Sequence, residues 1–142
     1  MEIRKLISRE DLTRAFLVMR ELRTHLSERQ YFDLLETMTG EGYELIALLD
    51  EDEIKALAGI AYRTNFYYGK YCWVFDLITK ESDRSRGYGR SLLGHIEEAA
   101  RDRGCDVVAL SSGLQRTDAH RFYETTMGYD KTSFTFKKSL RI

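Results

Sequence analysis

The chain has no proline, and its 142 residues include only two cysteines and three histidines. It also lacks low-complexity tracts, internal repeats and linker-like shifts in composition, so we expect one continuous domain over residues 1–142. No apolar run approaches the ~20 residues of a membrane-spanning helix, and the charged start, MEIRKLISRED, is unlike a signal peptide. These features predict a cytoplasmic protein with no membrane partner.

Cys72 and Cys105 lie inside apolar runs, which is typical of small buried side chains in a reducing compartment. A disulfide between two strands of an exported protein is the alternative. The histidines, His25, His95 and His120, are far apart and show no metal-ligand spacing, so we predict no metal site.

The first half of the chain changes from helical to strand periodicity. A short strand over residues 3–7 precedes two helices, whose predicted N-caps are Ser8 and Ser27. Their apolar faces carry Leu12, Phe16, Met19 and Leu22 in the first helix and Phe32, Leu35 and Met38 in the second. Gly40 and Gly42 end the second helix. Strands follow over 43–49, 54–66 and 71–79, and the short connections between them favour an antiparallel meander.

The second half alternates helices and strands. An amphipathic helix carries Leu92, Leu93, Ile96, Ala99 and Ala100 and ends near Gly104. A strand over 105–111, a helix over 118–126 and a final strand over 129–136 complete the order β-α-α-β-β-β-α-β-α-β. This order predicts a mixed sheet with helices on its faces.

The sequence RSRGYGR, residues 84–90, joins a predicted strand to the helix after it. Glycines allow close backbone approach, the amides at a helix start point at a bound anion, and the helix dipole favours negative charge there. Arg84, Arg86 and Arg90 add three cations that suit phosphate oxygens. The loop lacks the third glycine of a dinucleotide fingerprint and the Gly-Lys-Ser/Thr of a nucleotide hydrolase. It therefore predicts a phosphate site of another kind.

A second feature lies in the later helix, where Ala119-His-Arg-Phe-Tyr-Glu124 is followed by Gly128 and Tyr129. In this order and spacing, the loop and the helix together resemble the GNAT superfamily of N-acetyltransferases. The loop pattern is met by Arg84, Gly87 and Gly89, and the helix pattern by Ala119, Phe122, Tyr123, Glu124, Gly128 and Tyr129. Residues 75–79 resemble the family's central strand, and residues 57–59 the strand before it. Arg116 stands where the family often has an asparagine that contacts pantetheine.

The resemblance implies an α/β (α+β) fold with a mixed, mostly antiparallel sheet of about six to seven strands flanked by four helices. It implies acetyl-CoA as co-substrate, with its pyrophosphate on the amides of residues 86–90. Leu77 and Ile78 would offer main-chain hydrogen bonds to pantetheine and the thioester oxygen. The residues expected to bind acetyl-CoA are Leu77, Ile78, Thr79, Arg84, Arg86, Gly87, Tyr88, Gly89, Arg90, Ser91, Arg116 and Ala119.

Tyr123 is the residue that the resemblance implies as the acid that protonates the departing thiolate; a buried core aromatic is the alternative. Asp76 and Glu81 flank the expected cleft, where each is either the base for the amine or a structural carboxylate. Candidate walls for the acceptor pocket are Tyr62, Tyr67, Tyr68 and Trp73, although aromatic strands usually build core.

The expected activity is acetyl transfer to the primary amine of a small molecule or peptide. A non-catalytic acyl-CoA sensor is the alternative from another class, although a sensor would need only the loop. The run from Arg116 to Tyr123 also resembles aminoalkylphosphonate N-acetyltransferases, in which Arg116, His120 or Arg121 would bind an anionic acceptor. With a net charge of −1, three loop arginines do not make the basic track that nucleic acid needs. Family analogy is compatible with a homodimer.

Overall fold

A computed structural model of the protein describes residues 1–141. The chain forms two compact units, Met1–Leu110 and Ser111–Ile142. Within the described residues, no helix has both the length and the apolar character needed to cross a membrane.

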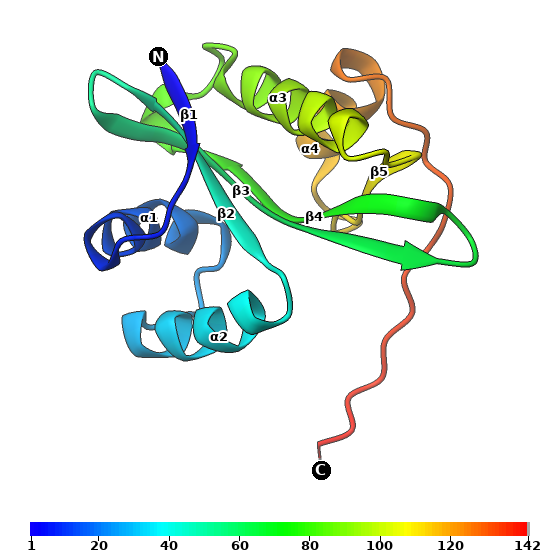
Figure 1. The fold of residues 1–142 in the computed structure, drawn as a ribbon, viewed down its shortest axis with the longest axis horizontal. Helices are drawn as coiled ribbons and strands as arrows, with labels where there is room; N and C mark the ends of the chain where they lie inside the picture. The colour runs from blue at the N-terminus through cyan, green and yellow to red at the C-terminus, as the bar shows by residue number, and fades with distance from the viewer. Residues whose placement is uncertain (142) are drawn as a thin grey trace. The chain divides into compact units, whose positions relative to one another are not determined.

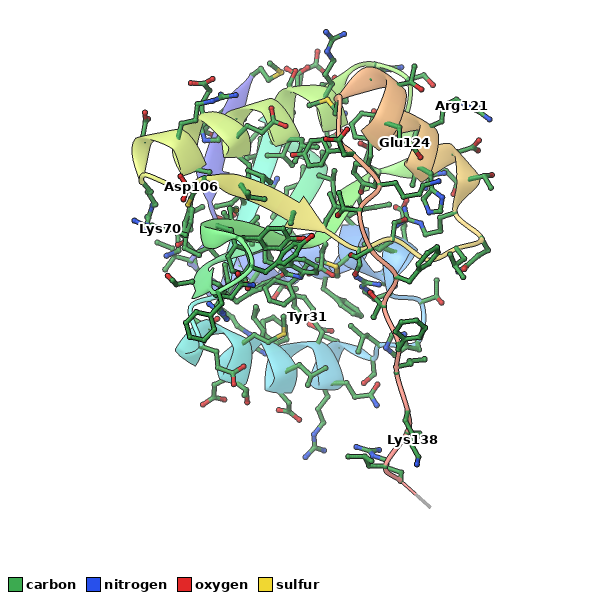
Figure 2. The ribbon with its side chains drawn as sticks, turned by 90° about the vertical axis from the view of Figure 1, so that its right-hand side faces the viewer. Tyr31, Lys70, Asp106, Arg121, Glu124 and Lys138 are labelled. Carbon is green, nitrogen blue, oxygen red and sulfur yellow. The ribbon has the colours of Figure 1, made fainter. Side chains whose placement is uncertain are left out.

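The first unit is built on one five-stranded sheet in the order β1-β2-β3-β4-β5 (Figure 1). Its strands are β1 (Glu2–Lys5), β2 (Glu44–Asp50), β3 (Glu53–Asn65), β4 (Gly69–Thr79) and β5 (Val107–Leu110). The first four pair antiparallel in sequence order, and β5 pairs parallel with β4. The predicted antiparallel meander is confirmed. Figure 2 shows Lys70 and Asp106 beside each other where β4 and β5 start, and the Asp106 amide donates to the Lys70 carbonyl at 2.7 Å.

The turn between β2 and β3 is charged and forms a tight hairpin. Its two central residues, Glu51 and Asp52, have φ values of 53° and 63°. Positive φ at both positions is typical of a type I′ turn, whose twist matches that of the flanking strands. The turn therefore brings the end of β2 and the start of β3 together at one corner of the sheet.

Helices α1 (Arg9–Leu22) and α2 (Glu28–Gly40) cover one face of the sheet (Figure 1). Both predicted N-caps are confirmed: the Ser8 hydroxyl accepts from the Asp11 amide, and Ser27 forms a reciprocal capping box with Gln30. The core on this face joins the helices to the strands, and Figure 2 shows Tyr31 between α2 and the sheet. Its buried members are Leu6, Ala15, Phe16, Val18, Met19, Tyr31, Leu35, Tyr43, Leu45, Ala47, Leu49, Ile54, Leu57 and Ile78.

Helix α3 (Tyr88–Asp102) covers the opposite face (Figure 1). Its buried side chains, Leu92, Leu93, Ile96 and Ala100, recur at helical spacing, as the sequence predicts. Strand β5 follows after Gly104 and is shorter than the predicted strand over 105–111.

The second unit contains the α-helix α4 (Thr117–Arg121), which continues into a π-helix over Phe122–Thr126. Together they confirm the predicted helix over 118–126. Residues 127–141 have no regular secondary structure, so the predicted final strand over 129–136 is wrong. Thr132, Phe134 and Phe136 alternate as in a strand. Alternation in one segment, however, does not supply the second segment with which a strand must pair.

Within residues 1–141, the sheet therefore has five strands and not six to seven. The mixed, mostly antiparallel character and the four α-helices are as expected.

Candidate active site

Strand β4 has an open edge near its end. Its pairing with β5 stops at Val74 and Leu110, while its pairing with β3 continues to Thr79. The Lys80 amide donates to the Lys55 carbonyl at 2.9 Å, which fixes the alternation of backbone groups along this strand. The amides and carbonyls of Leu77 and Thr79 therefore face away from β3, toward the side that β5 has left. Those of Ile78 face β3.

The loop between β4 and α3 has two residues in the left-handed region. After the 3₁₀ turn Glu81–Asp83, Ser85 has a φ of 68° and Gly87 a φ of 81°. A methyl group at Gly87 would meet no atom within 4 Å, so glycine is needed there for its φ and not for space. Ser85 adopts this region without that freedom, which is uncommon outside turns and functional loops. The backbone therefore turns sharply twice just before α3.

Helix α3 begins with backbone amides that make no hydrogen bond within the helix. Gly87 is its N-cap and has no side chain, and no side-chain cap forms there among the described residues. The first intrahelical bond runs from the Ser91 amide to the Gly87 carbonyl at 3.0 Å. The amides of Tyr88, Gly89 and Arg90 precede it and so have no acceptor within the helix. Together with the positive end of the helix dipole, they form an anion site.

Three arginines belong to this loop and to the first turn of α3. Arg84, Arg86 and Arg90 are exposed, and none of the ion pairs between described residues involves them. Ser91 is exposed beside them in the first turn of α3. The arrangement suits a ligand that carries several phosphate oxygens.

Both ends of the loop are fixed to the β2–β3 hairpin. Before the loop, the buried Asp83 carboxylate lies 3.4 Å from the Lys55 ammonium on β3. After it, the Tyr88 hydroxyl donates to Asp50 at the end of β2 at 3.0 Å, and this bond raises the pKa of Tyr88. Residues 84–91, called the cradle below, are therefore held at two points while their arginines stay exposed.

The two carboxylates considered as bases differ in their surroundings. Asp76 is buried and accepts from Arg23 through one oxygen and from the Tyr43 hydroxyl through the other. It is thus a paired, structural carboxylate. Glu81 is exposed, and its amide donates to the Glu21 carboxylate at 2.8 Å.

Tyr123 lies in the second unit, at the second position of the π-helix, and is 9 % exposed. Its ring contacts Phe122 and Tyr129, with centroids 5.4 and 6.1 Å apart. Burial raises the pKa of Tyr123, and the cation of Arg116 partly offsets this rise. The hydroxyl therefore stays protonated at neutral pH.

The other predicted residues of this unit lie on α4. Arg116 is its N-cap residue and Ala119 lies in its first turn, both half-buried. The His120 ring nitrogen is 2.8 Å from the Gly113 carbonyl, and Arg121 pairs with Asp118 and points outward in Figure 2. Of the three side chains considered for an anionic acceptor, Arg116 is the one whose charge acts on Tyr123.

Sequence patterns missed the residues that hold the site in place. Asp50, Lys55 and Asp83 fix the loop, and Arg23 and Tyr43 hold Asp76. Their partners are 28 to 53 residues away along the chain, so no local motif marks them. Asp83 alone offered a signal, because it is an acidic residue directly before a loop rich in arginine.

Two comparisons of sequence identify the family. Residues 8–129 match the model of the Acetyltransferase (GNAT) family. The chain is 40 % identical over 139 residues to the uncharacterized N-acetyltransferase YhdJ of Bacillus subtilis (strain 168), covering 97 % of this chain and 98 % of that protein. It is also 38 % identical over 65 residues to the aminoalkylphosphonate N-acetyltransferase of Salmonella typhimurium (strain LT2), covering 46 % of this chain and 42 % of that one.

Solved structures share the fold. A GNAT family acetyltransferase of Staphylococcus aureus superposes with a TM-score of 0.80 at 22 % identity, covering 98 % of both chains. The aminoglycoside N-acetyltransferase AAC(6')-Iy in complex with CoA gives a TM-score of 0.84 at 14 % identity, covering 99 % of this chain and 95 % of that one. The chain therefore belongs to the acetyltransferase (GNAT) family and is an N-acetyltransferase that uses acetyl-CoA.

Proposed function

We propose that the enzyme transfers the acetyl group of acetyl-CoA to a primary amine of a small molecule or peptide, by direct attack of the amine on the thioester. The observation that carries the proposal is the cradle at residues 84–91. The amides of Tyr88, Gly89 and Arg90 have no acceptor within α3, the three arginines make no ion pair with a described residue, and both ends of the cradle are fixed to the β2–β3 hairpin.

The residues present fit the co-substrate. The amides of Tyr88, Gly89 and Arg90, with the side chains of Arg84, Arg86 and Arg90, match the charge of a pyrophosphate. At the open edge of β4, the backbone groups of Leu77 and Thr79 are free of β3 and suit the amides of a pantetheine arm. The buried Ile78 side chain supports the same strand from the core. In the second unit, Arg116 and Ala119 stay proposed contacts, on the strength of the helix motif alone.

The reaction forms a C–N bond and breaks the C–S bond of the thioester. The amine attacks in its neutral form, so its proton must pass to a base or to water. Asp76 is committed to two donors, which leaves the exposed Glu81 carboxylate and water as acceptors. An amide at the β4 edge would stabilise the negative oxygen of the tetrahedral intermediate, and such donors typically contribute about 10²–10³ in rate.

Tyr123 would donate its hydroxyl proton to the departing thiolate and recover it from solvent. Its raised pKa keeps the donor form populated over the whole physiological range. This residue separates the proposal from a non-catalytic acyl-CoA sensor, which needs the cradle and no acid. A sensor would bind acetyl-CoA without releasing thiol.

An aminoalkylphosphonate is a second candidate acceptor, supported by the partial similarity to the Salmonella enzyme. The side chain that favours it is Arg116, because burial raises the pKa of Tyr123 and this cation is close enough to offset part of the rise. An acceptor that carries both an amine and an anionic group would place the anion near this guanidinium. The cytoplasmic location and the homodimer stay predictions.

The experiment that tests the function is a screen of amines with acetyl-CoA, in which free thiol and acetylated product are both measured. The panel contains matched pairs, such as an aminoalkylphosphonate and the corresponding alkylamine without the phosphonate. We expect thiol release that depends on the amine and equals product in amount. Acetyl-CoA binding without turnover on any amine, peptides included, would support the sensor and contradict the proposal.

A further inference from the structure

Strand β4 contains a bulge at the position where its outer edge opens. Gly59 of β3 is opposite Asp76, and Ile60 is opposite Val74, so Phe75 is an extra residue with no partner in β3. A bulge of this kind bends the strand and leaves its extra residue without ladder bonds. The last pair between β4 and β5 is formed by Val74, directly before the bulge. The bulge therefore marks the boundary between paired and open β4.

Tyr43 holds the bulge from the core side. Its hydroxyl donates to Asp76 Oδ2 at 2.7 Å, and both residues are buried. A Cβ atom at Gly59 would lie only 1.7 Å from the Tyr43 hydroxyl oxygen, so the phenol rests directly on the backbone of β3. Burial and the negative charge of Asp76 raise the pKa of Tyr43, so the hydroxyl remains a donor. The ring thus fixes Asp76 against the strand opposite the bulge.

Arg23 is the second residue that holds the bulge. It is the C-cap residue of α1, where the connection to α2 begins. Its Nε donates to Asp76 Oδ1 at 3.0 Å, and its second guanidinium nitrogen donates to the Phe75 carbonyl at 2.9 Å. The carbonyl of Phe75, the extra residue of the bulge, therefore accepts a hydrogen bond from the guanidinium of Arg23. This side chain is 42 % exposed, so it links the buried carboxylate to the surface of the α1–α2 connection.

The backbone beyond the bulge forms the open edge of β4, where the amides and carbonyls of Leu77 and Thr79 face away from β3. We infer that Tyr43, Asp76 and Arg23 are positioning residues for acetyl transfer, which hold the open edge of β4 at the angle that its amide donors need. This inference rests on the proposed function, and none of the three touches the reacting atoms. Because Arg23 begins the α1–α2 connection, movement of that connection would change the geometry of β4.

The test removes one hydroxyl and keeps the ring, in Tyr43→Phe. Tyr31→Phe is the matched control, since Tyr31 is buried on the same face and its hydroxyl also makes one hydrogen bond, to the Leu12 carbonyl at 2.9 Å. We expect kcat to fall about tenfold in Tyr43→Phe, because small displacements of a donor are costly in rate. The Kd for acetyl-CoA should change less than about threefold, because the cradle is untouched. Tyr31→Phe should keep the wild-type kcat.

A second variant, Arg23→Gln, alters a half-exposed residue and leaves the core intact. It should lower kcat in the same way. Equal losses of kcat in Tyr43→Phe and Tyr31→Phe, or wild-type kcat in Arg23→Gln, would overturn the inference.

Hydrogen exchange of the backbone amides gives a readout that needs no amine. The amides of Asp76 and Ile78 face β3, and they should exchange faster in Tyr43→Phe and Arg23→Gln than in wild type, but not in Tyr31→Phe. Unchanged exchange in both would count against the positioning role. If wild type acetylates no amine, the proposed function fails, while the exchange data still report whether the network holds the bulge.

Discussion

The hydroxyl of Tyr88 donates a hydrogen bond of 3.0 Å to Asp50, which joins the first residue of α3 to the last residue of β2. These residues are 38 positions apart in sequence. The bond fixes the helix start whose free amides form the anion site, so the orientation of those amides depends on the hairpin as well as on the loop.

Removing this bond should weaken acetyl-CoA binding without unfolding the protein. We expect Tyr88→Phe and Asp50→Asn each to raise the Kd about threefold, and the double variant to be little worse than either single one. Such non-additivity is the sign of two residues acting through one contact. Calorimetric titration of the four proteins measures it. Fully additive effects would show that the two side chains act separately.

The left-handed backbone at Gly87 predicts a sharp contrast with a second glycine of the same helix. Gly87→Ala forces a side chain to φ 81°, which costs on the order of 1–2 kcal/mol, and relaxation of the loop should raise the Kd for acetyl-CoA about tenfold. Gly94→Ala lies within α3, where a methyl group meets no atom within 4 Å, and should stabilise the protein by up to about 1 kcal/mol. Urea unfolding and calorimetry measure both. Equal effects at the two positions would contradict the role of Gly87.

The three loop arginines should make acetyl-CoA binding depend on salt. Replacing Arg84, Arg86 and Arg90 together by Gln should raise the Kd on the order of 100-fold in dilute buffer and flatten its dependence on ionic strength. Arg101→Gln is the control: it removes an exposed cation from the last turn of α3, where Arg101 pairs with Glu98. It should leave the Kd unchanged. The same loss in Arg101→Gln would indicate an effect of net charge alone.

The pKa of Tyr123 predicts the alkaline limb of the rate profile. Burial raises this pKa above its ordinary value near 10, and the acid form is the one that donates. With saturating amine and acetyl-CoA, ionisation of Tyr123 should therefore cause no fall in kcat between pH 8 and about 10. Any fall in this range should also be present in Tyr123→Phe. A tyrosine-dependent fall centred near pH 8 would mean that the hydroxyl ionises too early for this role.

The sequence predicted what is local. Ser8 and Ser27 predicted the starts of their helices because a cap acts on residues within three positions of it. The loop at 84–90 was recognised because its glycines and arginines are close together in sequence. The alternation over 129–136 predicted a strand where there is none, since pairing depends on a second segment that the pattern does not contain. The contacts of Asp76 with Arg23 and Tyr43 were missed for the same reason, because they join residues that are 53 and 33 positions apart in sequence.

The decisive measurement for acetyl transfer with a tyrosine acid is the kcat of Tyr123→Phe on an amine that the wild type acetylates. The variant keeps the ring against Phe122 and Tyr129 and loses only the proton donor. We expect a fall in kcat of about 10²-fold with little change in the Kd for acetyl-CoA, because only the proton donor is lost. Wild-type kcat from pH 6 to 9 would contradict it and make Tyr123 a core aromatic.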